Sequence, residues 1–214
     1  MRRRTMLLEA FAFTFGAMCL VDVHAQEPSG KALVVYFSRT RGMPADADAV
    51  SHATPAVGST ALAAAAIAAE LCADLAAIEV RKDYPVDHRE NSIVAKRERD
   101  ADERPEFDLP SDFAQKLQSA QVVFLGYPIW WFQEPMVIRS FLLVYRQELK
   151  AKIVVPFCTS LAVDVDRSAR NIRELLASDK VLEGRRFETG NAGTPEAAAR
   201  WARTIFNQCM RRAP

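Results

Sequence analysis

The chain contains five short, nearly continuous apolar runs, a pattern typical of strands that are buried on both faces of a parallel sheet. Between and after these runs the sequence turns to helical patterns. The alternation predicts an α/β fold in three layers, with a doubly wound, parallel, five-stranded sheet of strand order 2-1-3-4-5. The expected strands are Lys31–Phe37, Leu75–Val80, Val122–Leu125, Lys152–Cys158 and Val181–Phe187. The expected helices are Ala61–Ala73, Arg89–Asp102, Asp112–Ala120, Met136–Tyr145, Val165–Ala177 and one from Thr194 to about Gln208.

Hydroxyl-bearing residues follow the first strand and open the first helix. Ser38, Arg39 and Thr40 come directly after the strand, and a surface loop over 43–57 then leads to Gly58, Ser59 and Thr60. A helix start exposes unpaired N–H groups at the positive end of the helix dipole, which suits a phosphate. The alternative is a helix cap without a ligand, with Ser59 or Thr60 as the N-cap.

A second segment of interest follows the third strand. Gly and Pro at Gly126-Tyr127-Pro128 are expected to break that strand. Large apolar side chains come next, and their ring faces can stack on a flat ligand. The alternative is that the tryptophans pack on the core or at the contact of a homodimer. The residues expected to line this crevice are Pro128, Ile129, Trp130 and Trp131, with Thr159, Ser160, Leu161 and Ala162 after strand four as the opposite wall.

Composition and motifs narrow the function. The chain of 214 residues has a formal net charge of +1 and therefore no basic surface of the kind that binds nucleic acid. Neither GxGxxG nor GxxxxGK[ST] follows the first strand, which disfavours dinucleotide-binding and NTPase folds. Cysteine spacing indicates no metal site, and no catalytic triad or carboxylate pair appears. One phosphate site beside one flat ring site indicates flavin mononucleotide (FMN).

The N-terminus has the pattern of a secretory signal. Arginines at 2–4 precede an apolar stretch, and Val23-His24-Ala25 is a cleavage signal with the cut expected before Gln26. We therefore expect a signal peptide at 1–25, one domain at 26–214, and export to the periplasm. A retained membrane anchor, a wrongly assigned start codon and a twin-arginine export route stay open as alternatives.

Four stretches together resemble a known family. LVVYFSR, the G-S-T before the Ala-rich helix, FLGYPIWW and IVVPFCT are similar to flavodoxin-like proteins, in particular to the branch with a GYPIWW loop. The resemblance implies a flavodoxin-like fold that binds FMN non-covalently and carries electrons, or reduces small acceptors with a nicotinamide donor. By the same resemblance, the phosphate-loop positions are Ser38, Arg39, Thr40, Ser59 and Thr60, and the first ring-contacting loop is Pro128, Ile129, Trp130 and Trp131.

One departure from the family keeps other functions open. Residues 160–164 (SLAVD) stand where the branch usually has a Gly-rich stretch that lets the backbone approach the flavin. A flavodoxin-fold binding module that has lost FMN is therefore an alternative. A quinone reductase at the membrane surface, with the N-terminal segment kept as an anchor, is another. The expected partners are a redox protein or a small-molecule acceptor.

Overall fold

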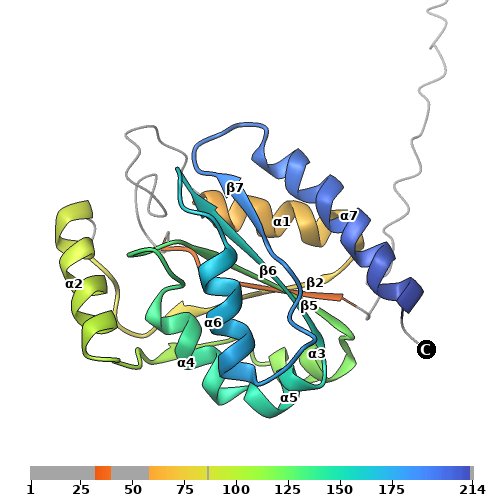
Figure 1. The fold of residues 1–214 in the computed structure, drawn as a ribbon, viewed down its shortest axis with the longest axis horizontal. Helices are drawn as coiled ribbons and strands as arrows, with labels where there is room; N and C mark the ends of the chain where they lie inside the picture. Colours follow the sequence, from red (N-terminus) through yellow and green to blue (C-terminus); the bar gives the residue numbers. More distant parts are fainter. Residues whose placement is uncertain (1–31, 40–57, 86, 213–214) are drawn as a thin grey trace, which may run out of the picture.

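The computed structural model of the chain describes residues 32–39, 58–85 and 87–212. Its centre is a five-stranded parallel sheet with the order β2-β1-β5-β6-β7 (Figure 1). Counted along the chain within this sheet, that order is 2-1-3-4-5, so the predicted fold class is confirmed. The strands are β1 Ala32–Tyr36, β2 Asp74–Ala77, β5 Val122–Pro128, β6 Ile153–Ser160 and β7 Arg185–Glu188.

Helices cover both faces of the sheet because successive strand residues point to opposite sides. In β1, Ala32 and Val34 pack in the core under one helical layer, whereas Leu33 and Val35 pack under the other. The first layer consists of α1 Ser59–Leu71 and α7 Thr194–Arg212. The second consists of α3 Phe113–Ser119, α4 Met136–Val144, α5 Arg146–Lys150 and α6 Asp166–Leu176. Helix α2, His88–Asp100, stands at one end of the molecule (Figure 1).

Three elements differ from the sequence-based expectation. The single strand expected at Leu75–Val80 is divided, because β3 Glu79–Val80 leaves the main sheet and pairs antiparallel with β4 Phe107–Asp108. The short helix α5 was not expected at all. The last strand starts late, since Val181 makes only an isolated bridge to Val154 before β7 begins.

The expected break at Gly126-Tyr127-Pro128 is wrong. Strand β5 continues through Pro128 because its neighbour β6 continues beside it, with Pro128 opposite Thr159. Gly126 is required by packing, since a Cβ at this position would lie 2.2 Å from Cζ of the buried Phe157. The Gly-Pro signal here marks a close approach and the last residue of a strand, not a turn.

Pro156 occupies a central strand without breaking it. The backbone N–H of Val154 donates to the oxygen of Lys180. The backbone nitrogen of Pro156, two residues further along the strand, faces the same side of β6. On that side β7 begins only opposite Phe157. No β7 carbonyl therefore lies opposite the missing N–H, which is the circumstance in which strands tolerate proline.

Within the described residues, no helix is both long and apolar enough to cross a bilayer. Nor do their His, Cys, Asp and Glu side chains form a group able to hold a metal ion. The expected signal at 1–25, Thr40 and the loop over 43–57 lie outside the described residues, so the export signal stays a prediction.

Candidate functional site

Helix α1 begins at Ser59, and Gly58 is its N-cap. Gly58 has an extended backbone and no side-chain capping hydrogen bond, so the expectation that Ser59 or Thr60 would cap the helix is wrong. The first N–H groups of a helix have no partner within the helix and form its positive end. This helix start therefore offers backbone donors toward the edge of the sheet where β1 and β5 end.

The hydroxyls of Ser59 and Thr60 are built into the fold. Thr60 shares a hydrogen bond of 2.6 Å between its Oγ1 and that of Thr159, and both residues are fully buried. The Gly190 N–H donates to Ser59 Oγ at 3.1 Å. Since the oxygen of Thr159 also accepts from the Ile129 N–H at 3.1 Å, Thr159 joins the start of α1 to the loop after β5.

An open pocket of about 370 Å³ lies between the loop after β5, the loop after β6 and one side of α2. Its walls are largely apolar and aromatic. Of the residues selected from the sequence, it brings together Arg39, Ile129, Trp130, Trp131 and Ser160. The sequence reasoning missed the contributions of α2, namely His88, Asn91, Ser92 and Ala95. Leu161 and Ala162 stand in the wall after β6, where the sequence placed them, and Phe132 and Val163 complete the lining.

The other selected residues have different positions. Pro128 is buried in β5, and Thr159 is buried at the end of β6. Gly58 is buried at the start of α1, and Ser38 lines a smaller neighbouring pocket at the end of β1. Arg39 is only 7% exposed, and its Nη1 donates to the oxygen of Pro85 at 3.1 Å.

Trp130 both packs on the core and lines the pocket. Packing on the core, the alternative to ligand contact, therefore does not remove this residue from the candidate site. Its ring makes edge-to-face contacts with Phe37 and Tyr84, with centroid distances of 5.5 and 4.8 Å. Beneath it, the buried Tyr84 hydroxyl donates to Oε2 of Glu98 at 2.9 Å. Burial raises the pKa of Tyr84, and the nearby Glu98 carboxylate raises it further.

Trp131 and Phe132 form the tip of a tight hairpin. Trp130 and Gln133 exchange both backbone hydrogen bonds, at 2.9 and 3.2 Å. The two tip residues have φ values of 49° and 66°, as both central residues of a type I′ turn do, although Asn-Gly is usual there. Left-handed backbone at other residues costs about 1–3 kcal/mol each and is concentrated at functional sites.

Contacts from α2 hold this strained tip in place. The indole N–H of Trp131 donates to the oxygen of Ser92 at 2.8 Å, and the Arg99 guanidinium lies 5.2 Å from the ring centroid. Phe132, by contrast, is 58% exposed at the mouth of the pocket. The hairpin therefore holds one indole rigidly against α2 and leaves one aromatic ring open to a ligand or partner.

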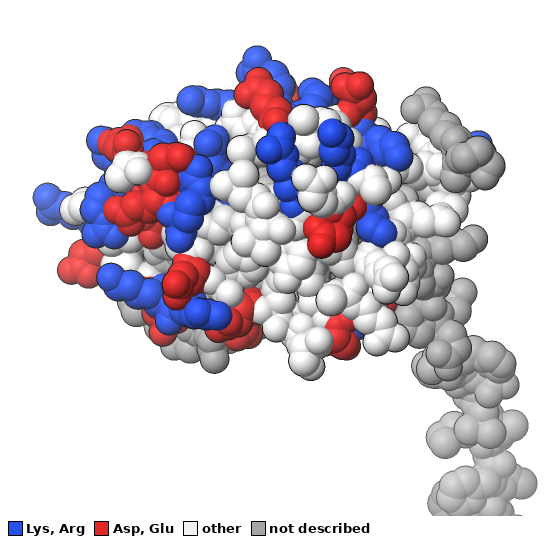
Figure 2. All heavy atoms as spheres, turned by 90° about the horizontal axis from the view of Figure 1, so that it is seen from below, with Lys and Arg blue, Asp and Glu red and all other residues white. Residues whose placement is uncertain are grey.

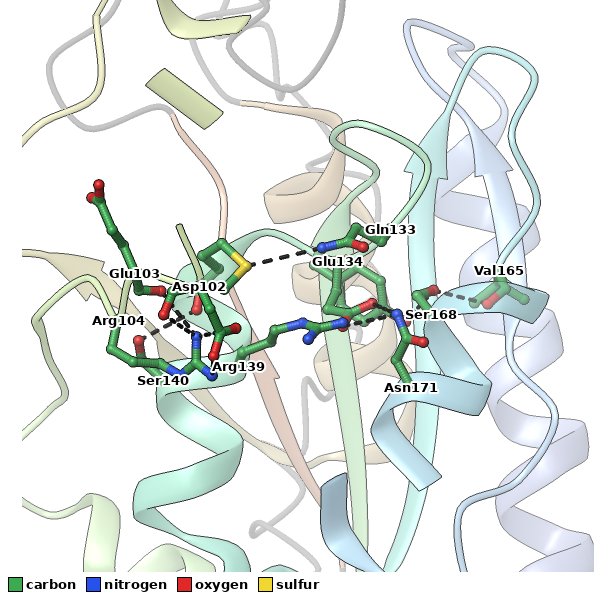
Figure 3. A network of polar contacts seen from close by, with 12 residues as sticks. Asp102, Glu103, Arg104, Gln133, Glu134, Arg139, Ser140, Val165, Ser168 and Asn171 are labelled. Carbon is green, nitrogen blue, oxygen red and sulfur yellow. Dashed lines mark hydrogen bonds and ion pairs between the residues drawn. The ribbon is translucent and has the colours of Figure 1, made fainter. Parts of the chain in front are cut away.

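A buried carboxylate fixes the other end of the loop (Figure 3). Glu134 is 1% exposed and accepts from Arg139 Nε at 2.8 Å and from the Asn171 amide at 3.1 and 3.2 Å. Burial raises the pKa of Glu134, while Arg139 and Asn171 act against that rise. The network joins the loop to α4 and α6, and no local sequence pattern predicts it.

The wall after β6 is also fixed by polar contacts. Ser160 Oγ accepts from the Val163 N–H at 2.9 Å, which closes a short turn. Arg186 Nη1 donates to the oxygens of Ser160 and Leu161, at 3.1 and 3.2 Å. The side chains of 161–163 thus stand in the wall of the pocket and leave its interior open.

Known proteins share this sequence pattern and this fold. The flavodoxin family profile matches residues 31–205. A protein from Bacteroides eggerthii DSM 20697, named as a candidate flavoprotein, is 28% identical, with a TM-score of 0.60 over 82% of this chain and 98% of that one. No curated protein matches the sequence significantly.

Two more distant structures share the fold. A flavoprotein from Lactobacillus acidophilus NCFM in complex with FMN is 17% identical, with a TM-score of 0.53, covering 74% of this chain and 90% of that one. A WrbA-like flavodoxin from Agrobacterium tumefaciens is 15% identical, also with a TM-score of 0.53, covering 86% and 99%. With the family profile matched over most of its length and the sheet order of that fold, the chain belongs to the flavodoxin family.

Proposed function

We propose that the protein binds FMN and transfers electrons, either to a redox partner protein or to a small-molecule acceptor. One observation carries this proposal. The start of α1, which has no side-chain cap, and the aromatic pocket lie at the same edge of the sheet, joined through Thr60, Thr159 and Ile129. A phosphate donor set and a ring site are thereby adjacent, although they are about 70 residues apart in the chain.

The residues present fit the two halves of FMN. Backbone N–H groups at a helix N-terminus suit a phosphate dianion. The pocket of about 370 Å³ lies within the range of roughly 300–1,000 Å³ that is usual for small-molecule sites. The loop after β6, despite its larger side chains, forms a wall and does not fill the pocket, which favours FMN binding over the alternative of a module that has lost it.

FMN would supply the redox chemistry, and the protein would supply binding, orientation and access. Trp130 and Trp131 would lie against the ring and exclude water from it, with Trp130 supported by Tyr84 and Trp131 supported by Ser92. The N-terminus of α1 would hold the phosphate. No side chain of the site is assigned a catalytic role.

The test compares FMN with riboflavin, which has the same ring and no phosphate. We expect FMN to quench tryptophan fluorescence and saturate the wild-type protein. Ser59→Asp places a negative charge in the first turn of α1, which favours the helix but repels a phosphate. The variant should weaken FMN binding by about tenfold or more, a loss of about 1.4 kcal/mol, and leave riboflavin binding unchanged.

Ser111→Asp is the matched control, because it adds the same charge at an exposed position just before α3. It should bind both flavins as the wild type does. Absence of saturable FMN binding to the wild type would refute the proposal and favour a binding module without flavin. Equal loss of FMN and riboflavin in Ser59→Asp would place the phosphate elsewhere.

A further inference from the structure

A groove runs beside the aromatic pocket along the outer side of α2. We call it the α2 groove, and its lining residues are His88, Arg89, Ser92, Ile93, Lys96, Arg97, Asp100 and Trp131. His88, Ser92 and Trp131 also line the aromatic pocket, so the two spaces adjoin one another. A molecule at the mouth of the pocket can therefore extend over the α2 groove.

The charge of the α2 groove favours an anion. Arg89, Lys96 and Arg97 line it, and Asp100 is the one carboxylate among its described lining residues. Figure 2 shows charges of both signs gathered at the end of the molecule where α2 lies, next to a face with few charges. Most of the charged side chains that line the α2 groove at this end are positive.

The existing ion pairs of α2 would not prevent ligand binding. Lys96 pairs with Asp100 at 2.5 Å and Arg97 with Glu103 at 3.2 Å, and all four side chains are at least 43% exposed. Exposed pairs of this kind contribute about 0–1 kcal/mol and rearrange easily. Among the described residues, the Arg89 side chain has no ion-pair partner, so its charge is available.

The spacing of the cations indicates the size of the anion. Arg89 and Lys96 are seven residues apart, which corresponds to about 10.5 Å along a helix. That span exceeds a single phosphate and suits a diphosphate or two separated anionic groups. Ile93, which is 62% exposed between these cations, and the Trp131 ring add an apolar surface for a base or another flat ring.

We propose that the α2 groove binds the phosphate-bearing part of a small molecule of the nucleoside diphosphate class. The inference extends the proposed function, because it assigns a second ligand class to the surface beside the same site. The groove is separate from the N-terminus of α1, where the FMN phosphate is placed. Binding at the two positions is therefore measurable independently.

Calorimetric titration with ADP and with inorganic pyrophosphate tests the proposal, on the protein with and without FMN. Both probes should bind saturably, ADP more tightly because of its base. Arg89→Glu combined with Lys96→Glu should weaken both by about tenfold or more, since it reverses the local charge. FMN affinity in this double variant should equal that of the wild type.

Arg146→Glu combined with Lys150→Glu is the matched control, since it makes the same charge change on the exposed side of α5. Absence of saturable probe binding, an equal loss in this control, or a parallel loss of FMN affinity would overturn the proposal. Binding to phosphatidylserine-containing vesicles without binding to the soluble probes would also overturn it, in favour of a membrane surface. Failure of FMN binding alone would refute the proposed function and leave the probe titrations interpretable.

Discussion

The two adjacent tryptophans of the site have different environments and therefore different roles. Trp130 is supported from below by the edges of Phe37 and Tyr84, so its position depends on the core. Trp131 has a left-handed backbone and is held by Ser92 and Arg99 of α2, so its position depends on a peripheral helix. Helix α2 holds Trp131 directly, whereas it reaches Trp130 only through the hydrogen bond between Glu98 and Tyr84.

The carboxyl group under Trp130 couples this wall to pH. Glu98 is 6% exposed, and burial raises its pKa, whereas the hydrogen bond from Tyr84 acts to lower it. A carboxyl group with a raised pKa in the fold keeps its proton at pH values where the unfolded chain has lost it. Its stabilising contribution is complete below the unfolded pKa of about 4.3 and is lost as pH rises through the folded pKa.

Glu98→Gln removes this ionisation but keeps an acceptor for Tyr84. We expect the free energy of unfolding of the variant to rise relative to the wild type as pH rises above about 4, because only the wild type must then bury a charge or break its contact. Urea denaturation at several pH values measures the difference, with the exposed Glu148→Gln as control. A difference that stays constant with pH would contradict the prediction.

At the scale of elements, the site depends on the junction between α1, β5 and β6. The buried hydroxyls of Thr60 and Thr159 bond to each other, and the Thr159 carbonyl continues the link to Ile129. The junction fixes the direction of the first turn of α1 relative to the loop that carries the tryptophans. Precise placement of a helix start matters because the donors that bind an anion are backbone groups.

Thr60→Val tests this junction. The substitution keeps the shape of the side chain but leaves the Thr159 hydroxyl buried without this bond, so unfolding should become easier by about 1–3 kcal/mol. Combining it with Thr159→Val should cost less than the sum of the two single changes, since each removes the same interaction. Urea denaturation provides all three values. Thr204→Val, on the exposed side of α7, is the control and should change stability by less than about 0.5 kcal/mol.

At the scale of the whole molecule, two separate groups of aromatic residues have different tasks. On the α1 and α7 side, Trp201 packs against Phe124, Phe157 and Phe187 with ring centroids 5.6–6.4 Å apart. This aromatic cluster lies in the core that α7 closes. The aromatic pocket of the candidate site lies beside α2 and is lined by Trp130 and Trp131, not by Trp201. Stability and ring binding should therefore respond to different tryptophans.

Replacing Trp201 and Trp131 by alanine, one at a time, distinguishes the stabilising role of one tryptophan from the binding role of the other. Trp201→Ala should lower the free energy of unfolding by about 3 kcal/mol, as expected for loss of a large aromatic group from a core, and leave the FMN affinity of the folded protein unchanged. Trp131→Ala should cost less than half as much stability and weaken FMN binding about tenfold. Urea denaturation and FMN titration of both variants check the expectation. Equal effects of the two changes on FMN binding would contradict it.

The sequence by itself determined the sheet and the edge at which the candidate site lies. Five apolar runs at suitable spacing are enough to specify parallel strands, because such strands must be covered on both faces. The polar and aromatic residues directly after those runs must then gather at the carboxyl edge. That is why the sequence alone predicts that Ser59, Thr60, Trp130, Trp131 and Ser160 lie at this edge.

The tertiary structure alone decided how these residues are held. Gly126 reads locally as a break, but β5 continues through it because β6 pairs beside it, and the ring of Phe157 leaves no room for a side chain there. Glu134 finds its partner Asn171 37 residues away, and Trp131 finds Ser92 39 residues away. Local patterns report the propensity and burial of neighbouring residues, whereas these contacts arise from packing between distant elements, which no short window of sequence contains.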